Sequence, residues 1–354
     1  MKKILSAVIT VFSIAILFLA VSCHDPIFYM ISQEVVQEEG LQGDINSMVR
    51  FGDNLYISNG RIYKKTAESS TSTGLYNGQW TESSTSGIEG FVFFLATDTS
   101  YIYALSFQFT ADNDKSLNLA NNISLYASTD AQTWTEVDLS SFEQGAARIF
   151  DNGSNAAYIG IKTPTNNEGT EYTSTVYKLN GTSTPTTCSA PGDSLGAAGD
   201  QFWKTPAICY ANGKYYFSYN SKILYYWNNT SDYYNESLRD SIAHVELDCD
   251  DIQSIAATSD YLLLGTTKGI ARVKLNASGE PEATTTDFAN NAQSLVTGIV
   301  PMVFVLDPTQ PEGQTDEYAS MTIGGSLSSS QDTFTETGLY AYYPTRSVWN
   351  RDGN

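Results

Sequence analysis

Short β-rich runs separated by tight polar turns recur along most of this chain, and they constrain its fold more than any other feature. From Asn46 onward the first apolar runs are Met48–Phe51, Leu55–Ser58 and Arg61–Lys64, with Gly52-Asp53-Asn54 and Asn59-Gly60 between them. Two-residue connections of the Asn-Gly and Gly-Asp kind favour tight antiparallel hairpins. The pattern therefore predicts an all-β fold built from short antiparallel strands.

The same pattern returns at a spacing of about 40 to 60 residues, which indicates structural repeats. After the first unit, the repeats span Phe91–Val137, Ala147–Leu179, Ala207–Leu247, Ile252–Leu275 with a weak closing segment, and Leu295–Trp349. Repeated four-stranded antiparallel units are typical of a β-propeller, in which each blade buries its faces against its neighbours. We expect six four-stranded blades, with seven as the near alternative. A pair of β-sandwiches or a β-solenoid would show similar strands.

Composition and charge exclude some classes of partner. Only 16% of the 354 residues are charged, and the formal net charge is −20. Nucleic-acid binding draws on clustered Lys and Arg, so this balance argues against a nucleic-acid partner. It equally disfavours adsorption to anionic lipid headgroups. Any attachment to a membrane should therefore be chemical.

The first 23 residues carry the pattern of an export signal. Lys2 and Lys3 precede an almost unbroken apolar run, Ile4–Val21, which is followed by Ser22 and Cys23. A small residue directly before a cysteine makes this segment resemble a bacterial lipoprotein signal. In that family the peptide is removed before the cysteine, which then carries acyl chains. The resemblance implies that Cys23 is lipidated. The alternative is an uncleaved transmembrane helix, since the run is about the minimum length that spans a bilayer.

The signal also suggests how the chain is divided. We expect a signal peptide over residues 1–22, a lipidated tether over 23–44 and a single propeller domain over 45–354. Within the tether, Ile31–Val36 could add a strand to the C-terminal blade and close the ring. Another apolar stretch, Phe91–Phe109, is interrupted by Thr97-Asp98-Thr99-Ser100, so two strands and a turn explain it better than a second membrane span.

Cysteine and histidine are scarce. If Cys23 is acylated, Cys188, Cys209 and Cys249 remain, so at most one disulfide can form, and its pairing cannot be deduced. No two cysteines have CxxC spacing and the chain has two histidines, which argues against a structural zinc site.

The segment Ser128–Trp134, Ser-Thr-Asp-Ala-Gln-Thr-Trp, resembles an Asp-box, the Ser-x-Asp-x-Gly-x-Thr-Trp turn of sialidases and other propellers. The resemblance implies that Asp130 accepts turn amide hydrogens and that Trp134 packs between strands. The motif has a structural role and supplies no catalytic group. Gln132 stands where the family usually has Gly.

An acidic segment, defined by Glu246, Asp248 and Asp250, follows His244 with apolar residues between. On a strand this alternation places the polar side chains on one face, where carboxylate oxygens could hold Ca²⁺. The alternative is a solvated face of an outer blade strand, which also protects a sheet edge from pairing with another chain. No other cofactor is expected.

Two aromatics, Tyr233 and Tyr234, stand among polar residues, so we expect them to be exposed and to be candidates for binding a sugar or a protein. No catalytic residues can be singled out. None of the seven arginines stands in a sialidase-like context, and no pair among the 39 acidic residues can be singled out as the two carboxylates of a glycosidase. A Ser-His-Asp triad would need His244, and no Gly-x-Ser-x-Gly elbow accompanies it.

A lipoprotein signal with Ala20 at a position where most bacteria have Leu, followed by a Ser/Thr/Tyr-rich propeller, resembles the β-propeller lipoproteins of treponemal spirochaetes. The resemblance implies a protein anchored in the bacterial envelope, in the outer membrane on its surface or periplasmic side. Our first hypothesis is a non-enzymatic binding or surface-display module with a protein or glycan partner. The alternatives are a glycan-active hydrolase or lectin that uses the central face of the propeller, and a periplasmic assembly scaffold.

Overall fold

The computed structural model describes residues 45, 47–66, 80–108, 123–142, 146–153, 155–164, 172–187, 206–219, 221–228, 243–258, 260–287, 299–305, 319–324, 338–343 and 348–351. All of them belong to one compact unit, Leu41–Gly353. Their strands form six four-stranded sheets, and within each sheet the strand order follows the chain order.

The strand bounds are as follows. The first two sheets contain β1 (Ser47–Phe51), β2 (Asn54–Ser58), β3 (Ile62–Thr66) and β4 (Thr81–Glu82), then β5 (Phe91–Thr97), β6 (Ile102–Phe107), β7 (Ile123–Ser128) and β8 (Thr135–Val137). The next two contain β9 (Ala146–Asp151), β10 (Ala157–Pro164), β11 (Tyr172–Asn180) and β12 (Ser183–Thr187), then β13 (Pro206–Ala211), β14 (Lys214–Tyr219), β15 (Ile223–Asn228) and β16 (His244–Glu246). The last two contain β17 (Ile252–Ala257), β18 (Tyr261–Thr266), β19 (Gly269–Leu275) and β20 (Pro281–Asp287), then β21 (Ile299–Val305), β22 (Ala319–Gly324), β23 (Gly338–Tyr343) and β24 (Val348–Arg351).

Every sheet is an antiparallel meander, and the hairpin turns that the structure describes have sequences that favour them. Between β13 and β14, for example, Asn212 and Gly213 have φ angles of 53° and 75°, and Ala211 pairs with Lys214 directly after the turn. Two successive positive φ angles define the turn whose twist matches that of a two-stranded hairpin, and Asn-Gly adopts it with the least strain.

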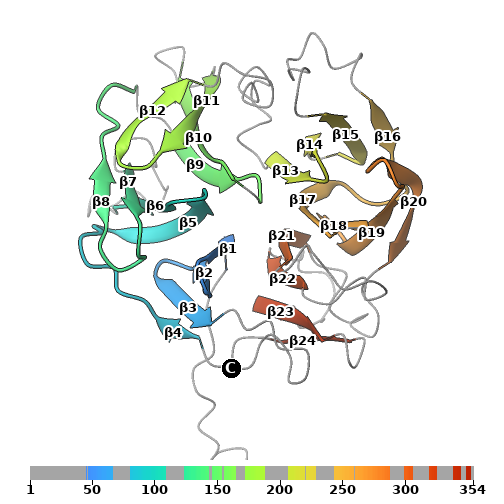
Figure 1. Cartoon of the computed structure of the whole chain (residues 1–354), viewed down its shortest axis with the longest axis horizontal. Coiled ribbons are helices and arrows are strands. Elements are labelled where there is room, and N and C mark those ends of the chain that lie inside the picture. Colours follow the sequence, from blue (N-terminus) through green and yellow to red (C-terminus); the bar gives the residue numbers. More distant parts are fainter. Residues whose placement is uncertain are drawn as a thin grey trace, which may run out of the picture. The chain divides into compact units, whose positions relative to one another are not determined.

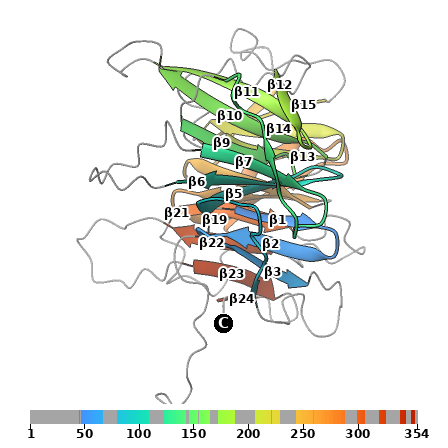
Figure 2. The same cartoon turned by 90° about the vertical axis from the view of Figure 1, so that its left-hand side faces the viewer.

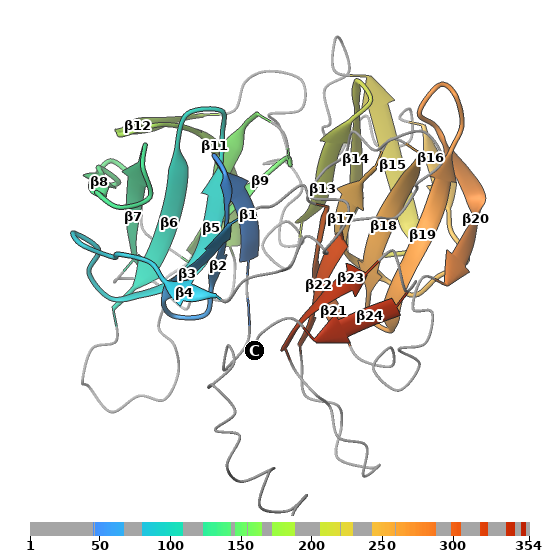
Figure 3. The same cartoon turned by 60° about the horizontal axis from the view of Figure 1, so that its bottom comes forward.

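The hydrophobic core lies between consecutive sheets. One cluster joins the first two sheets through Val49, Tyr56 and Leu95, and another joins the first and last sheets through Met48, Ile57 and Met302. Figure 1 shows β1, β5, β9, β13, β17 and β21 innermost, with the other strands of each sheet following outward. Figure 2 shows β9, β10 and β11 in this order within one sheet, and Figure 3 shows the sheets that begin with β17 and β21 side by side.

This arrangement confirms the prediction of an all-β propeller with four-stranded blades. A pair of β-sandwiches or a β-solenoid does not describe it, because the cores lie between successive sheets and the last sheet packs against the first. Phe91–Phe109 was expected to form two strands and a turn, and β5 and β6 confirm this. Among the described residues, no helix has the length and apolarity needed to cross a membrane.

Polar groups also connect the first and second sheets. A β-bulge in β5 displaces Phe93 from the ladder. The Ser58 hydroxyl donates to the Phe93 carbonyl oxygen at 2.7 Å, and the Ser47 hydroxyl accepts the Leu95 amide hydrogen at 2.7 Å. Two serines of the first blade thus satisfy backbone groups of the second, because a buried polar group needs a partner.

Several predictions fall outside the described residues. These are the signal peptide, the tether and the ring-closing strand at Ile31–Val36. All four strands of the last described sheet come from residues 299–351.

Candidate functional site

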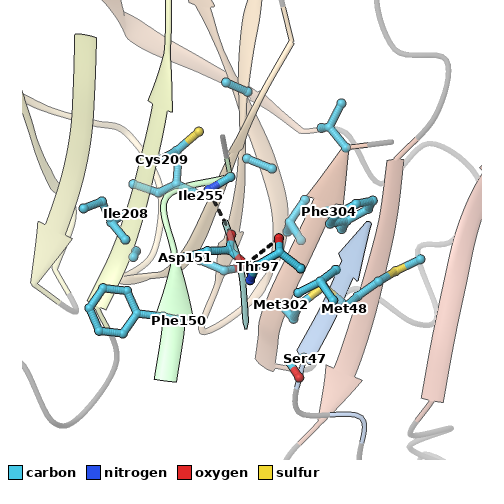
Figure 4. A pocket seen from close by; sticks show the side chains of 18 of the residues that line it. Ser47, Met48, Thr97, Phe150, Asp151, Ile208, Cys209, Ile255, Met302 and Phe304 are labelled. Atoms are coloured by element: carbon cyan, nitrogen blue, oxygen red, sulfur yellow. Dashed lines mark hydrogen bonds between the residues drawn. The ribbon is translucent and has the colours of Figure 1, made fainter. Parts of the chain in front are cut away.

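The six innermost strands surround a central cavity of about 700 Å³. Each of them contributes to its lining, because the first strand of every blade lies next to the ring axis. Figure 4 shows Met48, Met302 and Phe304 on one side of this cavity and Phe150 and Ile208 on the other. Small-molecule sites are commonly cavities of this size, with mainly apolar walls and a few polar groups.

Asp151, at the end of β9, is one of two carboxylates among the described residues that line the cavity. One of its oxygens accepts the Gly153 amide hydrogen at 2.9 Å. The other accepts the Thr97 amide hydrogen at 2.9 Å and the Thr97 hydroxyl at 3.5 Å. Burial raises the pKa of Asp151 to about 6, and these hydrogen bonds oppose the rise. The carboxylate therefore fastens β9 to β5.

Asp98, in the turn after β5, is the second lining carboxylate. Its Oδ1 accepts the amide hydrogens of Ser100 and Tyr101, both at 2.7 Å, and its Oδ2 accepts the Tyr103 hydroxyl at 2.5 Å. The Tyr103 oxygen in turn accepts the Gly181 amide hydrogen at 2.7 Å. Burial, followed by the hydrogen bond to Asp98, raises the pKa of Tyr103. This chain of bonds links the second and third blades.

Arg148, on β9, is the most unusual group of the cavity wall. Its guanidinium carbon lies 5.2 Å from the centre of the Phe94 ring, which is a cation–π contact. Its Nε is shielded from water and has no hydrogen-bond partner among the described residues. Burial lowers the pKa of Arg148 to about 10, so the side chain still carries its charge at neutral pH.

Cys209, on β13, lines the same cavity but is poorly suited to nucleophilic chemistry. Burial, reinforced by the charge of Asp151, raises the pKa of its thiol to about 12. Because the thiolate is the reactive form, this thiol is unreactive at neutral pH. Cys209 and Cys249 are both free, so they do not form the disulfide that the sequence allowed. Cys188 lies outside the described residues.

The turn at Ser128–Trp134 lies away from the cavity and has a dense set of hydrogen bonds. Asp130 Oδ1 accepts the amide hydrogens of Gln132 and Thr133, both at 2.8 Å, and the Ser128 hydroxyl at 2.9 Å. These bonds lower the pKa of Asp130. Trp134 is 6% exposed, and its indole nitrogen donates to the Ser84 carbonyl oxygen at 3.2 Å. The turn anchors the outer part of the second blade to the segment before β5.

The acidic segment lies on an outer edge, at and after β16, where its side chains are exposed. Glu246 pairs with Lys222 at 2.5 Å, which lowers the pKa of Glu246, and Asp250 pairs with Lys268 at 3.5 Å. Within the described part of the chain, no three His, Cys, Asp or Glu side chains gather closely enough to hold a metal ion. Calcium binding by this segment stays a prediction.

The remaining predicted site residues, Cys23, Tyr233 and Tyr234, lie outside the described residues. Arg148 and Asp151 were not among the site residues predicted from the sequence. A usable signal was present, because Arg148 is the only charged residue in the apolar run Ala147–Phe150. Nothing in the sequence alone placed that run beside the ring axis.

No protein-family model matches the chain, and no curated protein matches it by sequence. Similar solved structures include the Cps50 (Swd1) β-propeller domain of Myceliophteria thermophila, at 12% identity over 88% of this chain and 86% of that chain, with a TM-score of 0.43. Another is the PQQ-bound aldose sugar dehydrogenase of Streptomyces coelicolor, at 11% identity over 85% and 94%, with a TM-score of 0.44. A third is the computationally designed Ika8 protein, at 9% identity over 89% of both chains, with a TM-score of 0.38.

Proposed function

We propose that this chain is a lipid-anchored, non-enzymatic binding module of a bacterial envelope, built on a six-bladed β-propeller whose central cavity receives the ligand. Cys23 would carry the acyl lipid. The resemblance to treponemal β-propeller lipoproteins supports an outer-membrane location, and the six inner strands around the cavity support a preformed site. The partner is a small molecule, a glycan or an exposed part of another protein.

One observation carries the choice of binding over catalysis. Both described carboxylates of the cavity have both of their oxygens hydrogen-bonded to neighbouring groups of the fold: those of Asp98 to its own turn and Tyr103, and those of Asp151 to Gly153 and Thr97. Glycoside hydrolysis usually needs one carboxyl group to donate a proton and a second to act as base or nucleophile. Because all four oxygens are occupied by groups of the fold, neither carboxyl group is positioned to donate a proton to a substrate or to attack it.

A panel of glycosides separates the binding hypothesis from the hydrolase alternative. We expect no hydrolysis of any glycoside by the mature protein at micromolar concentration. Turnover that is lost in an Asp151→Asn or Asp98→Asn variant that is still folded would show that these carboxylates act in catalysis, and the proposal would then be wrong.

The anchor is tested separately, by metabolic labelling with radioactive palmitate and by membrane fractionation. We expect the wild-type chain to incorporate label and to partition with membranes, and the Cys23→Ala chain to do neither. Cys249→Ala is the matched control, because it removes a thiol of the propeller and should leave labelling intact. If the Cys23→Ala chain stays in the membrane with its signal uncleaved, residues 1–23 act as a helical anchor instead.

Protease treatment of intact cells distinguishes surface display from the periplasmic scaffold alternative. Digestion of the propeller in intact cells supports display to the outside. Protection until the outer membrane is permeabilised supports a periplasmic position.

A further inference from the structure

The guanidinium of Arg148 is a cation in the cavity wall without a counter-charge from the described residues. The four ion pairs between described residues lie elsewhere, and Nε of Arg148 has no hydrogen-bond partner among them. Its direct cross-strand neighbour on β10 is Gly160, which has no side chain to offer. A shielded cationic donor without a partner is costly, because its lost hydration is not replaced.

The two lining carboxylates cannot supply this partner without giving up other bonds. Asp98 closes the turn after β5, and Asp151 joins β9 to β5. Breaking either set would remove the hydrogen bonds that close this turn or join these two blades. The missing counter-charge is therefore more easily provided by a molecule that enters the cavity.

Part of the remaining lining is apolar, beside polar side chains such as Ser47, Gln253 and Thr258, and this apolar part indicates the body of that molecule. Met48, Met302 and Phe304 belong to one apolar group, and Phe150 and Ile208 belong to another across the cavity (Figure 4). Phe94 covers one face of the guanidinium. A ligand with an apolar body can use these walls, while its polar end reaches Arg148.

The charge of the ligand follows from the charges already present. The described lining contains Arg50 and Arg148 as cations and Asp98 and Asp151 as anions, and the whole chain is strongly acidic, with a formal charge of −20. A dianion such as phosphate would be opposed by this field, whereas a single negative charge is balanced by one guanidinium. The planar fork of Arg matches a carboxylate through two parallel hydrogen bonds.

We propose that the central cavity binds a small organic monocarboxylate, with its carboxylate on the guanidinium of Arg148 and its apolar body against the methionine and phenylalanine side chains of the wall. This inference rests on the proposed binding function and names the class of ligand that the cavity takes.

The test uses the mature protein and a graded panel of probes: acetate, octanoate, phenylacetate and indole-3-acetate. Phenylacetamide serves as the neutral analogue and inorganic phosphate as the alternative anion. Binding is measured by calorimetry and by the shift in melting temperature. We expect at least one carboxylate with an apolar body to bind, acetate to bind much more weakly, and phenylacetamide and phosphate to give no saturable signal.

Variants assign the binding to the residue. In Arg148→Gln we expect the affinity for the best carboxylate to fall roughly 30-fold or more, because one partner of a buried charged pair is lost. Arg148→Lys keeps the positive charge but not the two parallel N–H groups of the guanidinium. Its affinity for the carboxylate should therefore fall less than that of Arg148→Gln. Arg61→Gln is the matched control, because Arg61 forms an exposed pair with Glu82 on the outer part of the first blade and should not affect binding.

Circular dichroism must show that Arg148→Gln is folded. If it is not, the comparison of phenylacetate with phenylacetamide on the wild-type protein decides alone. The inference is overturned if no carboxylate binds at 10 mM, if acid and amide bind equally, if phosphate is preferred, or if folded Arg148→Gln binds as wild type does. In each of these cases, saturable binding of a glycan or protein partner would still support the proposed function.

Discussion

Replacing Asp151 with Asn should remove a specific part of the pH dependence of stability. In the folded chain the pKa of this carboxyl is raised from an ordinary value of 3.8 to about 6, because burial disfavours the charged form. The folded state therefore binds the proton more tightly than the unfolded state does. This contribution to stability is complete below about pH 4 and is lost as the pH rises through about 6.

The size of the effect follows from the shift. A difference of about 2 pH units between the two states corresponds to about 3 kcal/mol in the free energy of unfolding. We treat this figure as an upper limit, since the side chain is only partly buried and keeps some contact with solvent. Asp130 and Glu246 have lowered pKa values, so their contributions to stability change with pH in the opposite direction. The dependence of wild-type stability on pH is therefore a sum of opposing effects, and only the difference from Asp151→Asn isolates Asp151.

The assay is urea unfolding at several pH values between 4 and 7.5. Between pH 7 and pH 4 the wild-type protein should gain up to about 3 kcal/mol relative to Asp151→Asn. Ser278→Ala, which changes an exposed turn residue without a titratable group, should give a curve of stability against pH parallel to that of the wild type. If the curve of Asp151→Asn is also parallel to that of the wild type, Asp151 does not titrate as the structure implies.

Three further predictions concern stability. Tyr103→Phe should lower the free energy of unfolding by about 1.5 to 3 kcal/mol in urea titrations. The change removes the hydrogen bond to Asp98 and leaves the buried Gly181 amide without its acceptor. A loss below about 0.5 kcal/mol would contradict this. Gly181→Ala should cost clearly more than Gly213→Ala in the same assay, because both have positive φ but only at Gly181 would a new Cβ meet a tyrosine ring at 2.7 Å. If the acidic segment binds calcium, millimolar calcium should raise the melting temperature of the wild type but not that of Asp248→Asn; an unchanged wild-type melting temperature removes that hypothesis.

The sequence predicted the inner and middle strands better than the outer ones. Inner strands such as β17 pack against both neighbouring blades, so apolar residues recur along them and give a clear pattern. The outer strand β12, Ser-Thr-Pro-Thr-Thr, is polar and contains a proline, and Ser183, Thr184 and Thr186 are exposed. Proline is tolerated at a sheet edge, where one hydrogen-bonding side of the strand faces solvent. Such a strand therefore lacks the run of apolar and β-branched residues by which a strand is predicted from sequence.

The site was harder to predict than the fold. Asp130 stands in a local turn, so seven consecutive residues contain nearly all of its partners. Asp151 depends on Thr97, which is 54 residues away, and the environment of Arg148 depends on strands from all six sheets. Contacts of this range leave no local pattern in the sequence.

Each described sheet is made from four strands that follow one another along the chain, and the first and last sheets meet through side-chain packing. A continuous stretch of sequence therefore encodes a complete blade, with all of its ladder hydrogen bonds inside it. A duplication or deletion of such a stretch would change the size of the ring without forcing any strand to find a new partner. This modularity gives a simple route by which related rings could widen or narrow the central cavity while keeping the blade itself unchanged.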